Sequence, residues 1–173
     1  VNIGGMLAGL GDDYDITPHE GRPCSAFPNV FHPQFEAYCQ YRAREVCSPY
    51  VNDPWLFGYF LDNELAWWGR GGLETGLFDA VMTKSPAHTA KLALVDFLRS
   101  HFEGDIGRLN AIFDVKVTRF EDVLKLEELG TPSPQAEAVK QGFLARIADR
   151  YFGLATKAIR DIDPNHMILG SRF

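Results

Sequence analysis

The sequence predicts an α/β protein whose strands run parallel. Two apolar runs, residues 55–61 and 166–170, are short and rich in large side chains, which is typical of strands buried on both faces. Stretches with helical spacing of apolar residues separate the two runs, and this alternation characterises parallel sheets. With 173 residues, 46% of them apolar, the chain is long enough to bury the core of about one domain.

The first third of the chain is predicted to contain a strand, a loop, a helix and a second strand. Residues 2–10 are apolar and glycine-rich and are compatible with a short strand. Prolines and glycines exclude a helix over residues 11–33, and we interpret this long segment as an ordered loop over a site. A helix should begin at Pro33 and end before Pro49, because apolar residues recur there every three to four positions. Residues 55–61 then form the second strand.

Several helices are predicted between the two apolar runs. Ser85 and Pro86 have the residue types of an N-cap and a first turn, and Gly104 ends the helix that they begin. Two shorter helices, residues 106–113 and 120–129, follow. The apolar stripe of the first of these helices comprises Leu92, Val95, Leu98 and Phe102.

The last predicted helix is the longest. Residues 131–134 start it, and residues 163–165 stop it before the strand at 166–170. Its apolar stripe comprises Phe143, Ile147, Tyr151, Leu154, Ala158 and Ile162.

This strand count predicts a part of a larger domain. Three parallel strands do not make a stable sheet, whereas a full (β/α)8 barrel takes about 250 residues. The chain also begins at Val1 and ends at Phe173 directly after an apolar run. We therefore expect residues 1–173 to be a fragment of one (β/α)8-barrel domain, with a helical insertion at about residues 73–133. Such a fragment should be neither stable nor active alone, because its strand edges and apolar faces are open.

Charge and hydropathy argue against two classes of partner. There are 17 Lys and Arg against 23 Asp and Glu, a net charge of −6, and no basic run dense enough to follow a phosphate backbone. No apolar stretch approaches the roughly 20 residues of a membrane helix, and the first residues lack the pattern of a signal peptide. We expect neither nucleic acid nor a membrane as a partner.

Metal and disulfide chemistry are weakly indicated. Cys39 and Cys47 lie on one predicted helix, about 12 Å apart at 1.5 Å per residue, and cannot pair, so with Cys24 they are interpreted as free thiols. An acidic cluster in the first loop could hold Ca²⁺, but its spacing lacks the glycine and the terminal glutamate of an EF-hand. We expect a solvated loop that faces substrate, no metal and no cofactor. The cluster comprises Asp12, Asp13, Asp15, His19 and Glu20.

Polar residues end the second strand where a parallel barrel places its catalytic groups. Asp62, Asn63 and Glu64 follow the apolar run directly. A carboxyl group emerging from a hydrophobic strand is partly desolvated, which favours the protonated form that a general acid needs. Glu64 is thus the candidate acid, and the Asn63 amide suits a sugar hydroxyl. Alternatively, Asn63 caps the next helix and Glu64 interacts with its dipole.

The sequence around Glu64 resembles a known family. Residues 53–65, DPWLFGYFLDNEL, resemble the fourth-strand segment of retaining glycoside hydrolases with the (β/α)8 fold, especially β-agarases and the related β-galactosidases. Three further segments resemble the same group in the same order: residues 27–35 (FPNVFHPQF), 109–111 (LNA) and 163–173 (DPNHMILGSRF, the fifth strand).

The resemblance implies a function and several roles. The chain would comprise about strands 3 to 5 of the barrel, with the insertion between the fourth and fifth strands. Its enzyme would cleave a β-linked galactose-containing glycan, with Glu64 as acid/base and a nucleophile from the seventh strand, outside this chain. Trp67 and Trp68 would stack on sugar or, equally, pack under the insertion. Arg172 would reach a substrate hydroxyl or carboxylate, or form a surface ion pair.

Two other functions remain open at this point. A carbohydrate-binding protein on the same scaffold would keep the aromatic cleft without paired glutamates, and a metal-dependent hydrolase would use the acidic loop. A polysaccharide substrate would imply a secreted or periplasmic enzyme. The partners expected are an oligo- or polysaccharide and the remainder of the barrel.

Overall fold

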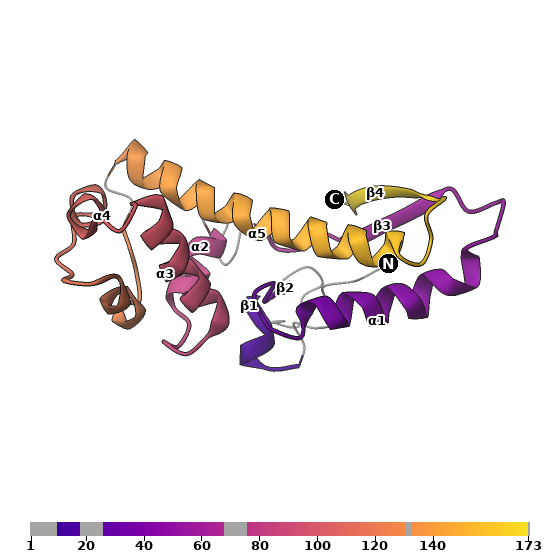
Figure 1. Ribbon diagram of the computed structural model, residues 1–173, viewed down its shortest axis with the longest axis horizontal. Coiled ribbons are helices and arrows are strands. Elements are labelled where there is room, and N and C mark those ends of the chain that lie inside the picture. The colour runs from indigo at the N-terminus through magenta and orange to yellow at the C-terminus, as the bar shows by residue number, and fades with distance from the viewer. Residues whose placement is uncertain (1–9, 18–25, 68–75, 131–132, 173) are drawn as a thin grey trace. The chain divides into compact units, whose positions relative to one another are not determined.

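The computed structural model describes residues 10–17, 26–67, 76–130 and 133–172, and the chain divides into two compact units (Figure 1). Unit 1 comprises Val1–Ala66 and Ala148–Phe173, and unit 2 comprises Trp67–Ile147. The long helix α5, Pro134–Arg160, belongs to unit 2 in its first half and to unit 1 in its second half. The described residues form a mixed α/β arrangement with two two-stranded sheets and no closed barrel.

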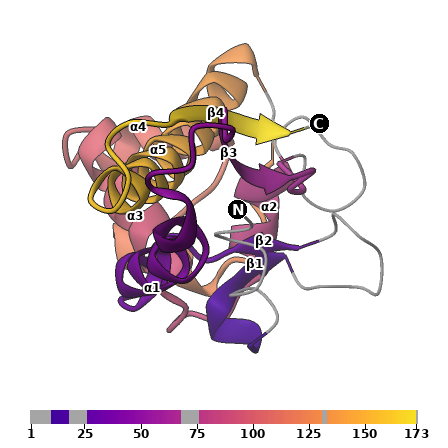
Figure 2. The same cartoon turned by 90° about the vertical axis from the view of Figure 1, so that its right-hand side faces the viewer.

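Unit 1 contains both sheets. Its short antiparallel pair is β1, Asp15–Thr17, and β2, Phe27–Pro28 (Figure 2). Its parallel pair is β3, Gly58–Asn63, and β4, Met167–Arg172, which lie side by side in Figure 1. The other elements of unit 1 are the 3-10 helices Asp12–Tyr14 and Ser48–Tyr50, the helix α1, Phe35–Cys47, and the second half of α5.

The parallel pairing of β3 with β4 confirms the prediction for the two apolar runs. Gly58 lies opposite Met167, and Asn63 lies opposite Arg172. A Cβ atom at Gly58 would stand 2.4 Å from the carbonyl oxygen of Met167, so the close approach of the strands requires glycine there. The first residues of β3 and β4 therefore meet at a position where only glycine fits in β3.

An aromatic cluster forms the core of unit 1. The Tyr151 ring of α5 lies 6.0 Å from the Phe27 ring and 6.3 Å from the Phe35 ring, centroid to centroid. Cys39 and Cys47 are buried and free, as predicted, and burial raises the pKa of the Cys39 thiol to about 12. Cys24 lies outside the described residues.

Unit 2 is helical. It contains α2, Gly76–Met82, α3, Thr89–His101, α4, Ile106–Phe113, the 3-10 helix Phe120–Lys125, and the first half of α5. The buried Lys91 amine joins three of its segments by donating hydrogen bonds to the carbonyl oxygens of Met82 (2.7 Å), Lys84 (3.0 Å) and Leu126 (2.7 Å). All three ammonium protons are therefore used inside the unit.

Two predicted helices differ from the observed ones. The helix α3 begins at Thr89 and not at Ser85, because His88 is its N-cap and its Nδ1 accepts a hydrogen bond of 3.2 Å from the Ala90 amide. Leu92, expected in the buried stripe, is exposed, whereas Lys91 and Leu94 are buried. The helix predicted over 120–129 is shorter and of the 3-10 type. The helices α1, α4 and α5 confirm their predictions.

The apolar runs are less buried than predicted. The strand β3 begins only at Gly58, because the Asp53 carboxylate accepts a hydrogen bond from the Trp55 amide and holds a turn there. Trp55 is 92% exposed, and β4 is half-buried along most of its length. Among the described residues, β3 and β4 pair only with each other, so each keeps one open edge.

The segment over residues 11–33, predicted as a loop without helix, contains β1, β2 and the 3-10 helix Asp12–Tyr14 where it is described. This single helical turn precedes the first proline, Pro18, and prolines are compatible with short edge strands such as β2. The strand predicted over residues 2–10 falls almost entirely on residues that the structure does not describe.

Within the described ranges, no helix has both the length and the apolar character needed to cross a membrane.

Candidate active site at the carboxyl ends of β3 and β4

The carboxyl ends of β3 and β4 bring three predicted site residues together. Because the strands are parallel, their carboxyl ends meet at one edge of the sheet. The Arg172 guanidinium donates a hydrogen bond to the Asn63 side-chain oxygen, and the Glu64 amide donates one of 2.8 Å to the Arg172 carbonyl. Asn63, Glu64 and Arg172 therefore lie together at this edge, joined by one side-chain bond and one backbone bond.

Glu64 has an unusual backbone conformation. Its φ of 55° lies in the left-handed region, which few residues other than glycine adopt and which is enriched at functional sites. Its side chain is half-buried. Residues 65–67 are not helical and α2 begins at Gly76, so the alternative in which Asn63 caps the next helix is wrong for the described residues.

Asp62 is a buried carboxylate at the same edge. Its Oδ2 accepts hydrogen bonds from the Tyr151 hydroxyl (2.8 Å) and the Ser171 hydroxyl (2.9 Å). Burial raises the pKa of Asp62, and the two hydroxyl donors oppose that shift without reversing it. The sequence prediction gave Asp62 no role and placed Tyr151 only in an apolar stripe. The signal that could have indicated a contact was a carboxyl group at the end of an apolar strand and a tyrosine hydroxyl within an apolar helix stripe, since buried polar groups need hydrogen-bond partners.

The two tryptophans predicted to bind sugar are described in part. Trp67 is half-buried and belongs to unit 2. Trp68 lies outside the described residues. Both alternatives for these rings, stacking on sugar and packing under the insertion, stay predictions.

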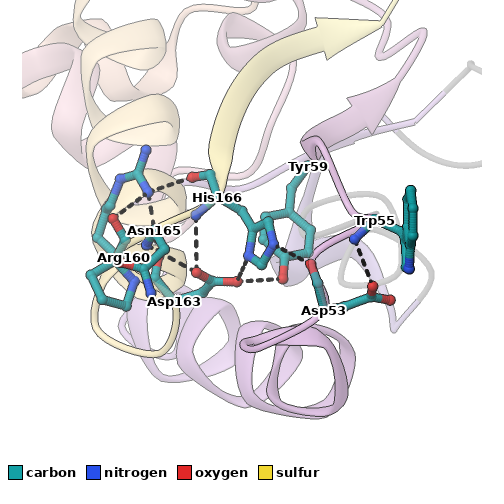
Figure 3. A network of polar contacts seen from close by, with 8 residues as sticks. Asp53, Trp55, Tyr59, Arg160, Asp163, Asn165 and His166 are labelled. Carbon is teal, nitrogen blue, oxygen red and sulfur yellow. Dashed lines mark hydrogen bonds and ion pairs between the residues drawn. The ribbon is translucent and has the colours of Figure 1, made fainter.

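A second polar network lies at the opposite, amino end of the same strands (Figure 3). The fully buried Asp163 carboxylate accepts hydrogen bonds from the Tyr59 hydroxyl (2.7 Å) and from the Asn165 (3.0 Å) and His166 (3.1 Å) amides. Burial alone would raise the pKa of Asp163, but these donors and the His166 ring lower it to about 2. Asp163 is therefore an ionised, fully bonded anion at neutral pH.

His166 completes this network as a charged partner. Its Nδ1 lies 2.6 Å from the Asp163 carboxylate, and its Nε2 lies 2.9 Å from the Asp53 carbonyl oxygen. Both of these oxygens can only accept, so both ring nitrogens must donate, and first the Asp53 carbonyl and then Asp163 raise the pKa of His166. An imidazolium that donates a hydrogen bond from each ring nitrogen has no free lone pair to act as a base. His166 is therefore a hydrogen-bonded structural residue.

The acidic loop gives no metal site among the described residues. Asp12 and Asp13 are exposed, but Asp15 is buried in β1, which corrects the prediction of a fully solvated cluster: strand pairing with β2 removes Asp15 from solvent. Within residues 10–17, 26–67, 76–130 and 133–172, no group of three or more His, Cys, Asp or Glu side chains is arranged to bind a metal ion. His19 and Glu20 lie outside these ranges.

Two curated proteins are similar in sequence to the chain. The chain is 29% identical over 129 residues to β-agarase B, and 28% identical over 130 residues to β-agarase A, both from Vibrio sp. (strain JT0107). Each match covers 70% of this chain but only 13% of the relative. No family model matches the chain.

Solved structures share the fold. A structure described as an exo-β-agarase matches with a TM-score of 0.77 and 27% identity, over 86% of this chain and 20% of that one. PfGH50B matches with a TM-score of 0.77 and 24% identity, over 86% of this chain and 22% of that one. The agarase AgWH50C matches with a TM-score of 0.78 and 23% identity, over 95% of this chain and 24% of that one.

These comparisons relate the chain to the glycoside hydrolases. Within that class its relatives are β-agarases, which confirms the resemblance seen in the sequence. The chain spans 13% of the length of the curated relatives that it matches.

Proposed function

We propose that this chain is part of the catalytic domain of a glycoside hydrolase that cleaves a β-linked, galactose-containing glycan of the agarose type. The observation that carries the proposal is Glu64 at the carboxyl end of a parallel strand, next to Asn63 and Arg172, in a chain related to β-agarases. In the intact domain β3 and β4 would be the fourth and fifth strands of a (β/α)8 barrel, and the helices of about residues 73–133 would be an insertion between them.

The proposed reaction is a double displacement. Glu64 protonates the glycosidic oxygen while a second carboxylate, supplied from outside this chain and about 5 Å away, attacks the anomeric carbon. The bond to the leaving sugar breaks and a glycosyl-enzyme forms. Glu64, now a carboxylate, removes a proton from water, which attacks the anomeric carbon and releases the nucleophile. Asn63 and Arg172 would hold substrate hydroxyls through their amide and guanidinium groups.

This mechanism predicts that the intact protein hydrolyses agarose with retention of configuration. The first product seen by proton NMR, before mutarotation, should carry the β configuration at its new reducing end. An α product would replace the retaining mechanism with an inverting one. Binding of agarose without release of reducing ends would favour the non-catalytic, carbohydrate-binding alternative instead.

Ring stacking by Trp67 or Trp68 gives a separate prediction. If either indole lines the substrate cleft, its replacement by Ala should weaken oligosaccharide binding by about 1 kcal/mol, as other ring contacts do. Calorimetric titration of Trp67→Ala and Trp68→Ala measures this loss. Trp55→Ala is the matched control, because Trp55 is exposed before the amino end of β3, and it should bind normally. Normal binding by both variants, with earlier melting, would assign the rings to packing.

The substrate class also suggests where the enzyme acts. Agarose is a polymer, so an enzyme that cleaves it has to meet it outside the cytoplasm. We therefore infer a secreted or periplasmic location.

A further inference from the structure

Asp62 joins three elements at the candidate active site. It is 3% exposed, it belongs to β3, and its Oδ2 accepts hydrogen bonds from Tyr151 on α5 and Ser171 on β4. Its Oδ1 is also buried and accepts no hydrogen bond from the described residues. Burial of a carboxylate is costly unless it is bonded, so a position where only half of the group is satisfied calls for a reason beyond packing.

An irregular strand turns Asp62 inward. Phe60 lies opposite Gly170 and Asp62 lies opposite Ser171, so β3 advances by two residues while β4 advances by one, and Leu61 is the extra residue of a bulge. Regular alternation would place Leu61 and Asp62 on opposite faces, but both are buried. Gly170, with a φ of 77°, adopts the left-handed backbone beside this irregularity. Bulges of this kind redirect side chains next to active sites.

The hydrogen bonds of Asp62 link it to the segment that contains Glu64 and Arg172. Ser171 immediately precedes Arg172, whose carbonyl accepts the Glu64 amide hydrogen and whose guanidinium bonds Asn63. Asp62 itself lies two residues before Glu64. Resting on the function proposed above, we propose that Asp62 is a positioning residue: through the Ser171 hydroxyl it fixes the carboxyl ends of β3 and β4 against each other, and thereby places Glu64 for proton transfer.

The experiment compares two substitutions that differ by one hydroxyl. In the intact protein, Ser171→Thr keeps the donor to Asp62, whereas Ser171→Val has the same shape and lacks it. We expect Ser171→Val to lower kcat on agarose by about 10- to 100-fold, since small displacements of a catalytic group have effects of this size, with KM changed less than about twofold. Ser171→Thr should retain kcat. Tyr151→Phe removes the other donor to the carboxylate and should lower kcat in the same way.

Tyr59→Phe is the control for a purely structural effect. It removes one hydroxyl bond to the buried Asp163 at the amino end of the same strand, so it should lower the melting temperature as much as Ser171→Val does, with kcat unchanged. Equal kcat for Ser171→Val and Ser171→Thr would overturn the inference, as would an equal loss of kcat in Tyr59→Phe. Glu64→Gln is measured alongside: if it keeps the wild-type rate, the proposed function itself fails and the positioning role with it. If Glu64→Gln is inactive while Ser171→Val and Ser171→Thr have equal kcat, only the positioning role fails.

Discussion

Glu64→Gln in the intact protein should lower the turnover of agarose by roughly 10² to 10⁴, the usual contribution of general acid–base catalysis. The amide keeps the shape of the side chain but has no proton to give to the glycosidic oxygen. Substrate binding should be nearly unchanged, because the variant lacks only the proton-transfer step. Initial rates of reducing-end release, measured with saturating and limiting substrate, separate kcat from KM.

A leaving-group test shows whether the lost function is proton donation. An aryl galactoside with an acidic phenol as leaving group does not need protonation, so Glu64→Gln should form the glycosyl-enzyme from it at close to the wild-type rate. The matched control is Glu103→Gln, because Glu103 has the same φ of 55° and lies in unit 2 with an exposed side chain. Wild-type turnover of agarose by Glu64→Gln would end the assignment of Glu64.

Local signals in the sequence predicted the elements whose ends are determined locally. The bounds predicted for α4 are those observed, because Asp105 accepts hydrogen bonds from the amides of Gly107 (2.8 Å) and Arg108 (3.2 Å) and so starts the helix on its own. The start of α3 is also set by a local N-cap, but the prediction chose the wrong residue. Ser85 has the more common N-cap side chain, but the ring nitrogen of His88 is the acceptor used.

Contacts between distant residues could not be predicted. The Tyr151–Asp62 bond joins residues 89 positions apart, and the Tyr59–Asp163 bond joins residues 104 positions apart. The direction of the Asp62 side chain depends on a bulge, and a bulge exists only relative to the partner strand β4. Regular alternation along β3 would put Leu61 and Asp62 on opposite faces, so the sequence of the strand alone does not show that both are buried on account of the bulge. The prediction therefore reached Asn63, Glu64 and Arg172 but missed the residues that hold them.

The exposure of Trp55 and Phe57 has a similar cause. Their apolar side chains predicted a strand from residue 55 onward, but burial depends on which elements cover a side chain, and that information is not local. The backbone bond between Glu64 and Arg172 follows from the parallel direction of the two strands, because the carboxyl ends of parallel strands share an edge whatever surrounds them.

Asp163→Asn should destabilise the amino end of the β3–β4 pair by about 1.5 to 3 kcal/mol, the usual contribution of hydrogen bonds to a buried charged group. The neutral amide leaves the His166 imidazolium without its anion and cannot accept from Tyr59 as a carboxylate does. Hydrogen exchange of the Met167 amide, which is bonded to the Phe57 carbonyl at 3.2 Å, reports this end of the sheet. Asp161→Asn, which alters an exposed ion pair with Lys157, is the control and should leave the protection of the Met167 amide nearly unchanged.

The same network predicts a stability that depends on pH in two directions. The pKa of Asp163 falls from an unfolded value of about 3.9 to about 2, so its contribution is complete above about pH 4 and is lost as the pH falls towards 2. The pKa of His166 is raised, so its contribution is complete below about pH 6.5, its ordinary value, and is lost as the pH rises through the folded value. Protection of the Met167 amide, corrected for intrinsic exchange, should therefore be greatest between about pH 4 and 6.5 in the wild type. In Asp163→Asn the acid-side loss should disappear, since no carboxylate titrates there, and the alkaline loss should shrink because His166 no longer faces an anion. An unchanged pH profile in this variant would show that Asp163 and His166 do not stabilise the sheet as a charged pair.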